Sequence, residues 1–435
     1  MNAAPKSVRL RVGVFGRANT GKSSLVNLVT GQETSIVSPV AGTTTDVVEK
    51  SMELLPLGPI TLLDTAGIDD STEIGSLRVS RTKSALATAD VAVLVLEAGV
   101  WTEYEEGIAE SAREKNIPLV VAVSKTDIAR PDPEWLSLIG KKTEWVFSCA
   151  APTAPAPGSP GRAEWERGRE ATVAELKRLL IACCPEDFLE PPRILGDLLP
   201  AGKGMPLAVL IVPIDLQAPK GRLILPQVQT IRDALDSDAA CAVVKEREYR
   251  PLLDRLGEPP DLVVCDSQIA LKMVADTPAG VPCTTFSILF SRFKGNVALL
   301  AEGAARLETL GPGDRVLVAE SCTHHALEDD IGRVKIPRWI RQFAGADVAV
   351  DHASGRDYPE DLERYALVVH CGGCTLTRRQ MLWRIEEARA RGVPVTNYGM
   401  AISVLQGVAE RTLSPFPEAL AAYRSALERA KGAPR

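Results

Sequence analysis

The sequence has little of several residue types on which large classes of proteins depend. Only 5% of its 435 residues are aromatic, and four are histidines. Basic residues (50) are fewer than acidic ones (56), and the net charge of −6 argues against nucleic acid as the main partner, because phosphate binding needs clustered Lys and Arg. No apolar run reaches the roughly 20 residues of a membrane-spanning helix, and residues 1–11 contain no apolar core of a signal peptide. We therefore expect a cytoplasmic protein that binds neither nucleic acid nor a membrane.

Cysteine is also scarce, and its nine residues are unevenly spread. This distribution fits free or metal-bound thiols in a reducing compartment better than a disulfide framework. An apolar content of 45% and a charged content of 24% are those of an ordinary globular protein with enough core to fold without covalent cross-links. At roughly 150 residues per domain, the length predicts about three domains.

A phosphate-binding loop is the first motif along the chain. Residues 8–15 alternate as a strand and lead into residues 16–23, which match the pattern G-x-x-x-x-G-K-[ST] and precede an apolar-periodic helix. Glycines in this loop let backbone N–H groups approach phosphate oxygens, and the helix N-terminus favours negative charge. Lys22 is expected to reach the β- and γ-phosphates, and the Ser23 hydroxyl to bind Mg²⁺. The expected nucleotide contacts here are Gly16, Asn19, Gly21, Lys22, Ser23 and Ser24.

Later motifs indicate that the nucleotide carries guanine. A strand ends in D-T-A-G, where Asp64 is expected to hold Mg²⁺ through water and the Gly67 N–H to meet the γ-phosphate. Another apolar strand, residues 119–123, is followed by S-K-T-D, a variant of the guanine motif N-K-x-D. In that motif Asp127 would accept hydrogen bonds from the base and Lys125 would lie over the ring.

Two details complete the predicted base site. Ser124 stands where the guanine motif usually has Asn, which affects affinity more than base identity. The loop after the strand at 145–147 is expected to contact the guanine oxygen through Ser148, Cys149 and Ala150. In this order and spacing the motifs resemble those of the translation-factor class of GTPases.

The switch residues indicate a narrower branch of the GTPases. Residues 41–46 resemble switch I of the tRNA-modification and ribosome-assembly branch of GTPases, which implies a Mg²⁺-binding hydroxyl on Thr44. In that branch Asn19 marks a K⁺ site, and a K⁺ ion could replace an arginine finger in neutralising transition-state charge. Ile68 occupies the position where Ras-like enzymes have the glutamine that orients water. We expect slow, K⁺-stimulated hydrolysis of GTP to GDP and phosphate, with Lys22, Thr44 and Gly67 as the catalytic residues.

The rest of the chain predicts two further α/β domains. A Pro-, Ala- and Gly-rich loop at 151–162 and a charged helix at about 163–182 would complete a P-loop GTPase domain at 1–185. Strands alternate with helices in 186–284, a pattern that predicts a parallel sheet, and no catalytic group stands out there. The alternation continues in 285–435, with strands expected at positions that include 316–319 and 367–370, and helices starting near Asn296, Thr377 and Ala401.

The last domain contains a group of soft metal ligands. Residues 370–374 read H-C-G-G-C and residues 322–325 read C-T-H-H, each just after a predicted strand. Since carboxyl ends of parallel strands line one crevice, the two groups can meet. Three thiolates favour an iron–sulfur cluster first and a Cys₃His zinc site second, with a redox dithiol or a metal-free core as the remaining alternatives. The candidate ligands are Cys322, Cys371, Cys374, His324 and His370.

With these motifs in this order, the whole chain resembles the HydF family of [FeFe]-hydrogenase maturation factors. The resemblance implies a homodimer formed through the domain at 186–284, and a Rossmann-like domain at 285–435 that carries a [4Fe–4S] cluster on Cys322, Cys371 and Cys374. It implies a scaffold that receives a diiron subcluster from the radical-SAM partners HydE and HydG and delivers it to the apo-hydrogenase HydA. The fourth cluster ligand stays open: His324, His370, Glu328, Asp329 or an exogenous group. The alternative is a K⁺-activated tRNA-modifying or assembly GTPase with a structural zinc site.

Overall fold

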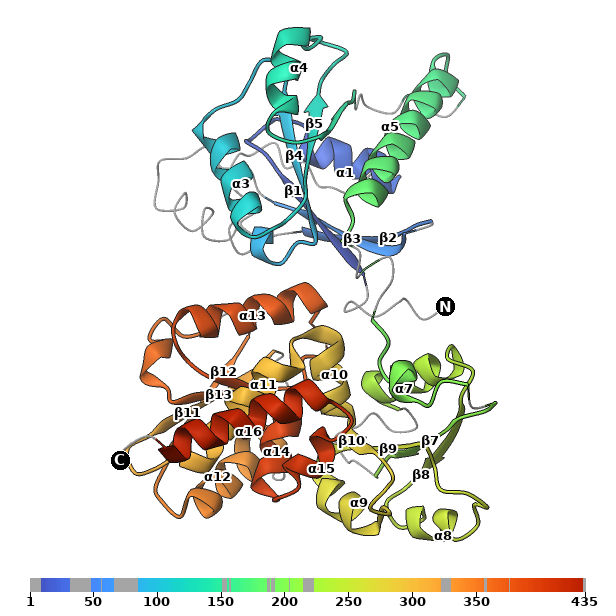
Figure 1. Cartoon of the computed structure of the whole chain (residues 1–435). Helices are drawn as coiled ribbons and strands as arrows, with labels where there is room; N and C mark the ends of the chain where they lie inside the picture. Colours follow the sequence, from blue (N-terminus) through green and yellow to red (C-terminus); the bar gives the residue numbers. More distant parts are fainter. Residues whose placement is uncertain are drawn as a thin grey trace. The chain divides into compact units, whose positions relative to one another are not determined.

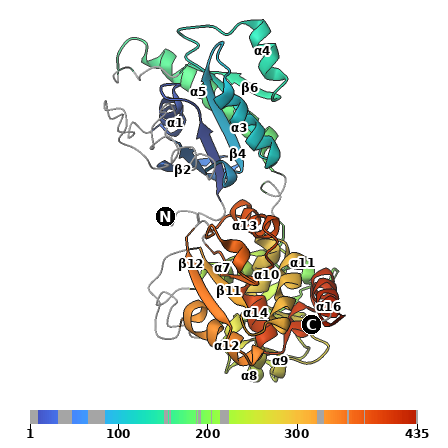
Figure 2. The same ribbon diagram turned by 90° about the vertical axis from the view of Figure 1, so that its left-hand side faces the viewer.

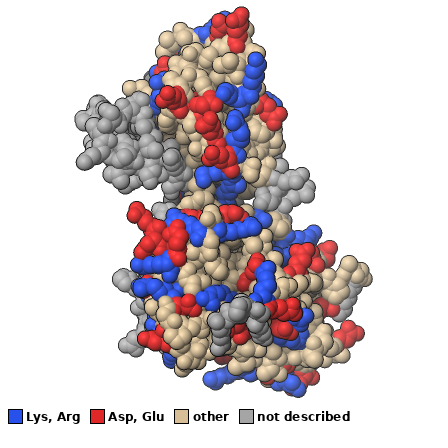
Figure 3. Space-filling view, turned by 60° about the vertical axis from the view of Figure 1, so that its left-hand side comes forward, with Lys and Arg blue, Asp and Glu red and all other residues tan. Residues whose placement is uncertain are grey.

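The computed structural model divides the chain into two compact units, residues 1–191 and 192–435, and each is described by itself (Figure 1). It describes residues 9–31, 48–55, 57–65, 85–150, 155, 158–185, 188, 192–202, 204–213, 223–321, 330–355, 358–374 and 376–432. None of the helices in these ranges is long and apolar enough to cross a membrane. On the face shown in Figure 3, basic side chains lie interspersed with acidic ones on both units.

The first unit is built on a six-stranded sheet with the order β2-β3-β1-β4-β5-β6. All neighbours pair in parallel except β2 and β3. Every residue of β1 and β5 is buried, as expected for central strands covered on both faces. The strands are β1 (Leu10–Phe15), β2 (Val48–Leu54), β3 (Gly58–Asp64), β4 (Val91–Glu97), β5 (Leu119–Ser124) and β6 (Trp145–Ser148).

Among the described residues, four helices of defined bounds cover this sheet, and two separate apolar clusters show which face each one covers. One cluster contains residues of α1 and α5, and the other contains residues of α3 and α4. Figure 2 accordingly shows α1 and α3 on opposite sides of the strands. The helices are α1 (Lys22–Thr30), α3 (Glu103–Glu114), α4 (Pro133–Gly140) and α5 (Arg162–Cys183).

The second unit contains two four-stranded parallel sheets. The first has the order β10-β9-β7-β8, from β7 (Leu207–Ile211), β8 (Ala240–Val244), β9 (Leu262–Cys265) and β10 (Cys283–Thr285). Its helices are α7 (Leu225–Leu235), α8 (Tyr249–Leu253) and α9 (Ala270–Asp276), with short 3₁₀ turns η2 (Gly196–Leu198) and η3 (Ser267–Ile269).

The second sheet has the order β12-β11-β13-β14, so the strand order reverses at β11. After β11 the chain goes to β12 on one side and then crosses to β13 on the other, and ligands of open parallel sheets bind at such a reversal, at the carboxyl ends of the strands. The strands are β11 (Arg315–Glu320), β12 (Ala349–Ser354), β13 (Leu367–His370) and β14 (Val395–Asn397).

Helices join the two sheets of the second unit into one structure. A single apolar cluster contains Leu210 and Val264 of the first sheet together with Leu317 and Val369 of the second. The helices around it are α10 (Phe286–Lys294), α11 (Val297–Ala304), η4 (Ala305–Thr309), η5 (Ile331–Lys335), α12 (Ile336–Ala344), η6 (Leu362–Arg364), α13 (Arg378–Ala390), α14 (Tyr398–Leu405), α15 (Ala409–Leu413) and α16 (Pro417–Gly432). In Figure 1, α16 lies along α11, which itself packs on β14.

These parallel sheets with their connecting helices confirm the predicted α/β class. The expected boundary at 284 falls inside β10, because the strand continues to Thr285 and leads without a linker into α10.

Candidate functional site

The phosphate loop connects β1 to α1 at the carboxyl edge of the first sheet. Gly16, Asn19 and Gly21 all have positive φ angles, of 147°, 62° and 92°. Gly16 is required for a second reason, since a Cβ atom there would lie 2.3 Å from the Val95 carbonyl oxygen. This backbone curls the loop and places Lys22 and Ser23 at the start of α1, where N–H groups attract phosphate.

The predicted Mg²⁺ partners meet at the same edge. Ser23 Oγ, at the start of α1, donates to Asp64 Oδ2, at the end of β3, over 2.9 Å. Burial raises the pKa of the Asp64 carboxyl, while the bond from Ser23 and the charges of Lys22 and Lys50 act in the opposite direction. Lys22 Nζ donates to the Arg17 carbonyl oxygen at 2.5 Å, so its ammonium lies over the loop. Ser24, the next helical residue, is exposed.

Ser124 ties the base motif to the phosphate loop. Its hydroxyl donates to the Thr20 carbonyl oxygen at 2.6 Å and is 3.1 Å from the Leu96 carbonyl oxygen. The next residue, Lys125, has a φ of 54° and pairs with Glu97 over 2.5 Å. The serine that departs from the usual motif therefore still joins the strand ends to the loop that would hold phosphate.

The predicted base contacts share this edge. Thr126 N–H donates to the Cys149 carbonyl oxygen at 3.4 Å, and Cys149 N–H donates to the Val123 carbonyl oxygen at 2.8 Å. Burial raises the pKa of the Cys149 thiol to about 12, and the nearby Asp127 carboxylate adds to the shift. Asp127 is exposed at this edge.

The flanking positions differ in exposure: Ser148 is exposed and Ala150 is half-buried. Two predicted catalytic residues, Thr44 and Gly67, lie outside the described residues, as do Ile68 and the rest of the switch segments.

In the second unit, the thiol loop follows β13 at the strand-order reversal. Cys371 N–H donates to the Ala319 carbonyl oxygen at 2.9 Å, and its sulfur accepts from Ser321 N–H at 3.2 Å, with Ser321 Oγ 3.3 Å away. Gly373 turns the loop with a φ of 56°. Cys371 is half-buried and Cys374 is exposed.

The other half of the predicted ligand set begins one residue after Ser321. Cys322 and His324 lie outside the described residues. Within the described ranges, no three His, Cys, Asp or Glu side chains are grouped to hold a metal ion. The contact of Ser321 with the Cys371 sulfur nevertheless brings the end of β11 to the thiol loop.

His370 faces the protein interior. Its Nδ1 atom donates to the Cys371 carbonyl oxygen at 2.6 Å, which leaves the lone pair on Nε2. Burial, together with the charge of the neighbouring Arg384, lowers the pKa of His370 to about 3, so the ring is neutral. Nε2 is buried and has no hydrogen-bond partner among the described residues.

A lysine that belongs to none of the sequence motifs lies against the thiol loop. Lys294, the last residue of α10, is 0% exposed, and its Nζ atom donates to carbonyl oxygens of Gly373, Cys374 and Leu376 at 3.0, 3.2 and 2.9 Å. Burial lowers its pKa to about 8, and Cys374 and Cys371 act in the opposite direction. The only sequence signal is a lysine that ends the stretch F-S-I-L-F-S-R-F-K, in which five of the other residues are apolar.

Two sulfurs beside an N–H donor and a buried cation fit an anionic metal–thiolate group. Hydrogen bonds to sulfur and nearby positive charge both stabilise such groups. The described part of the loop therefore fits an iron–sulfur cluster, with two of the three predicted thiols in place.

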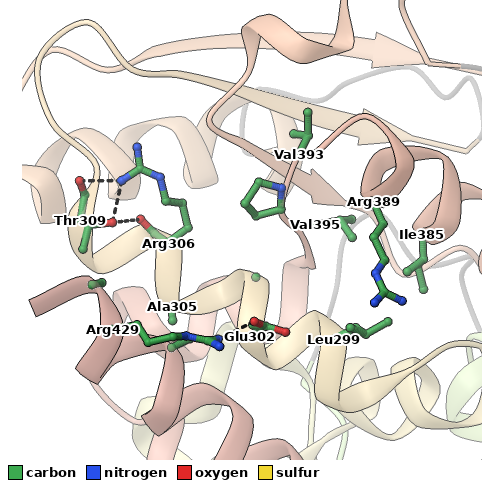
Figure 4. Close-up of a pocket in the computed structure, with 15 residues that line it drawn as sticks. Leu299, Glu302, Ala305, Arg306, Thr309, Ile385, Arg389, Val393, Val395 and Arg429 are labelled. Carbon is green, nitrogen blue, oxygen red and sulfur yellow. Dashed lines mark hydrogen bonds and ion pairs between the residues drawn. The ribbon is translucent and has the colours of Figure 1, made fainter. Parts of the chain in front are cut away.

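A separate cavity of about 600 Å³ opens near the amino end of β14, at the edge opposite to the thiol loop (Figure 4). Two of its guanidinium groups already have carboxylate partners: Arg306 pairs with Asp314, and Arg429 pairs with Glu302. It contains none of the predicted site residues.

Three family models match the chain. The Hydrogen maturase F dimerization domain matches residues 194–295, and the Hydrogen maturase F tetramerization domain matches residues 298–415. The 50S ribosome-binding GTPase model matches residues 11–125.

Curated relatives resemble only the first part of the chain. The tRNA modification GTPase MnmE of Synechococcus sp. (strain JA-3-3Ab) is 44% identical over 127 residues, which are 28% of this chain and 27% of the relative. GTPase Der of Clostridium perfringens (strain SM101) is 40% identical over 134 residues, 29% of this chain and 30% of the relative. The chain thus spans less than a third of the length of either relative.

Among solved structures, Aquifex aeolicus Era bound to GDP and AlF₄⁻ is 21% identical, with a TM-score of 0.33, and the match covers 57% of this chain and 98% of Era.

The family of the chain follows from the domain models. With a GTPase domain at its start and the two maturase domains across residues 194–415, the chain belongs to the hydrogen maturase F family.

Proposed function

We propose that this protein is a GTP-hydrolysing scaffold of [FeFe]-hydrogenase maturation, which holds a [4Fe–4S] cluster and carries a diiron subcluster precursor to the apo-hydrogenase. The observation that carries the proposal is the contact of Ser321 with the Cys371 sulfur in a chain that also has the phosphate loop. It brings the residue before Cys322 to the C-x-x-C pair at the reversal of strand order. We further propose the division into a GTPase domain at 1–185, a dimerisation domain at 186–284 and a cluster domain at 285–435.

The nucleotide half would work through charge and position. Backbone N–H groups of the loop and Lys22 would hold the phosphates, while Ser23 and Asp64 would hold Mg²⁺. Water attacks the γ-phosphorus, the bond to the β–γ bridging oxygen breaks, and GDP leaves with that electron pair. We propose that K⁺ beside Asn19 offsets the charge that develops, and that Thr44 and Gly67 complete the catalytic set.

Guanine would be selected at the other end of the same edge. Asp127 is exposed there and can accept from the base, and Lys125 is held by Glu97 beside it. The loop of Ser148, Cys149 and Ala150 would contact the guanine oxygen, although the Cys149 N–H already donates to the Val123 carbonyl oxygen.

In the second unit, Cys322, Cys371 and Cys374 would hold the cluster. When bound, a cluster on three thiolates supplies an iron with an exchangeable position. His324, Glu328, Asp329 and an exogenous group are candidates for it. His370 is a less direct candidate, because its ring is buried and its Nδ1 is committed to the Cys371 carbonyl.

The proposed assembly is a homodimer in the cytoplasm. Its support is the matched dimerization domain and the edge strand β8, where the Val243 side chain is 45% exposed. The proposed partners are HydE and HydG, which would load the diiron subcluster, and HydA, which would receive it.

Two variants of the full chain test the proposal. Cys371→Ser, purified anaerobically, should lose the brown colour, the iron and the EPR signal of the reduced cluster, and should no longer activate apo-hydrogenase after loading. Its GTP hydrolysis should stay near wild type. Lys22→Ala should keep the iron and lose about 100-fold or more of its GTPase rate, because it removes a charged donor to the phosphates. Zinc in place of iron in the wild-type protein would instead support the alternative, an assembly or tRNA-modifying GTPase.

A further inference from the structure

The buried ammonium of Lys294 uses all of its hydrogen-bonding capacity on one loop. A lysine ammonium has three N–H donors and no acceptor, and the three carbonyl oxygens of Gly373, Cys374 and Leu376 match that number. Two of these carbonyls belong to the C-x-x-C segment itself. The positions of Cys371 and Cys374 therefore depend on a side chain from a helix 79 positions earlier in the chain.

The charge of Lys294 is not neutralised by a carboxylate within the described ranges. Among the described residues, Nζ contacts three neutral carbonyl groups and lies 5.8 Å from the centroid of the Phe290 ring. A wholly buried charge is costly unless an opposite charge lies close by. Among its described surroundings, the ionisable groups that act on it are the thiols of Cys374 and Cys371.

A reciprocal contact fixes the helix that bears Lys294. Arg378, the first residue of α13 after the thiol loop, donates to the Phe293 carbonyl oxygen at 2.8 Å and lies 3.5 Å from those of Arg292 and Gly295. At the other end of α10, Thr285 Oγ accepts from Ile288 N–H at 3.2 Å. Since Thr285 ends β10, the helix is anchored in the first sheet of the second unit and cannot shift independently of it.

We propose that Lys294 is a positioning residue of the metal centre: it holds the Cys371–Cys374 loop through three carbonyls, and its charge is the counter-charge of the thiolate-bound cluster. This inference rests on the proposed function, because it takes the occupant to be an anionic metal–thiolate group. Lys294 lies in the segment matched by the dimerization domain, whereas the loop it holds lies in that matched by the tetramerization domain.

The test separates the hydrogen bonds from the charge. Lys294→Met removes both, Lys294→Gln keeps two N–H donors without charge, and Lys294→Arg keeps the charge. Lys272→Met is the matched control, because Lys272 is a half-exposed lysine on neighbouring α9 whose partner is Asp276. The full chain of each variant is reconstituted anaerobically. We would measure iron and sulfide per chain, the rate of iron loss to a chelator, and the midpoint potential by EPR titration. The GTPase rate and circular dichroism serve as checks of folding.

Lys294→Met should lose iron several-fold faster than wild type, with an unchanged GTPase rate. Lys294→Gln should keep more iron, but its potential should move to more negative values because the reduced, more negative cluster loses its counter-charge. Lys294→Arg should keep a potential near that of wild type. If Lys294→Met does not fold, Lys294→Gln and Lys294→Arg decide the question between them.

Wild-type iron retention and potential in both neutral variants would overturn the inference. If the wild-type chain carries zinc, the proposed function fails. The rate of zinc loss to a chelator then tests the role of Lys294 separately. Faster zinc loss in Lys294→Met would support that role, and a rate equal to wild type would overturn it. If the wild-type chain binds neither metal, both proposals fail.

Discussion

Ser124 and Thr20 lie 104 positions apart in the chain, yet one hydroxyl joins them. The bond links the end of β5, where the base would be recognised, to the loop that would hold phosphate. Because Ser124 is buried and also lies beside the Leu96 carbonyl, its hydroxyl is fixed in direction. The expected base site and the phosphate loop are thus joined directly by one hydrogen bond.

Removal of that hydroxyl should loosen nucleotide binding. Ser124→Ala leaves the Thr20 carbonyl without its donor, a loss of about 1 kcal/mol, so GDP and GTP should bind about fivefold more weakly. Ser124→Asn supplies an amide donor and should recover most of the affinity. Fluorescent-nucleotide titration measures both, with Ser137→Ala on the exposed surface of α4 as the control. Equal affinities in all variants would show that the Ser124 bond is not used.

The thiols of the chain differ strongly in environment. Burial raises the pKa of Cys149 to about 12 and that of Cys283 to about 11, and it raises the pKa of the wholly buried Cys265 well above the usual value of a thiol. Cys374, in contrast, is exposed.

These differences predict the order of alkylation in metal-free protein. At pH 8 a thiol with a raised pKa of about 12 is thiolate in only about one molecule in ten thousand, and the thiolate is the reacting form. Iodoacetamide should therefore label Cys374 first, and Cys149 and Cys265 last among these residues, as read by peptide mass spectrometry over time. Raising the pH toward 10 should still leave Cys149 and Cys265 largely unlabelled. Early labelling of Cys149 would contradict the burial described for it.

At the scale of elements, β8 is an edge strand of the second unit in which no residue is fully buried. Within the described residues it pairs on one side only, with β7, so its other edge presents backbone donors and acceptors. An exposed edge strand with apolar side chains is a site where a second chain can pair. This is the surface on which the proposed dimer depends.

A charge on β8 should weaken the dimer. Val243→Lys places an ammonium on a side chain that is 45% exposed, and charged residues on edge strands oppose pairing. Size-exclusion chromatography with light scattering should show a lower apparent mass at the same concentration. Leu138→Lys on α4, where the leucine is 49% exposed, is a matched control that should leave the mass unchanged. A dimer equally stable in both would place the interface elsewhere.

Much of the fold could be predicted because local patterns determine it. The strand expected at 367–370 is β13, whose four residues are all buried. Thr377 and Asn296 were expected to begin helices, and each caps one: Thr377 Oγ accepts from Gln380 N–H, and Asn296 Oδ1 accepts from Leu299 N–H. Side-chain caps of this kind are visible in sequence.

Other elements depend on distant contacts that a sequence does not reveal. The helix α14 begins at Tyr398, three residues before the expected start, because Asn397 caps it and Gly399 allows close approach to Ser287. No helix was expected over 286–294, since α10 is short and buried on most of its surface, polar residues included, so it lacks a clear polar face. The role of Lys294 could not be predicted for the same reason.

At the scale of the whole molecule, the residues expected to handle nucleotide and those expected to hold metal lie in different units. Ser23, Asp64, Ser124 and Cys149 come together at one sheet edge of the first unit. Ser321, Cys371 and Lys294 come together at one sheet edge of the second. Motif spacing alone could place residues at these edges, because the carboxyl ends of parallel strands share one side of a sheet.

The continuity of β10 with α10 limits how the second unit can be divided or exchanged between relatives. The two maturase domain matches meet between residues 295 and 298, which suggests a natural place to excise a metal-binding cassette. A fragment cut there would leave Lys294 behind and uncover the surface against which Leu289 and Phe290 pack. Grafting the thiol loop into another protein would therefore also require the helix before it and the strand on which that helix is anchored. The proposed metal centre would therefore be inherited as part of a two-sheet unit, and the residues next to it in the sequence and those that contact it in the structure would have to vary together.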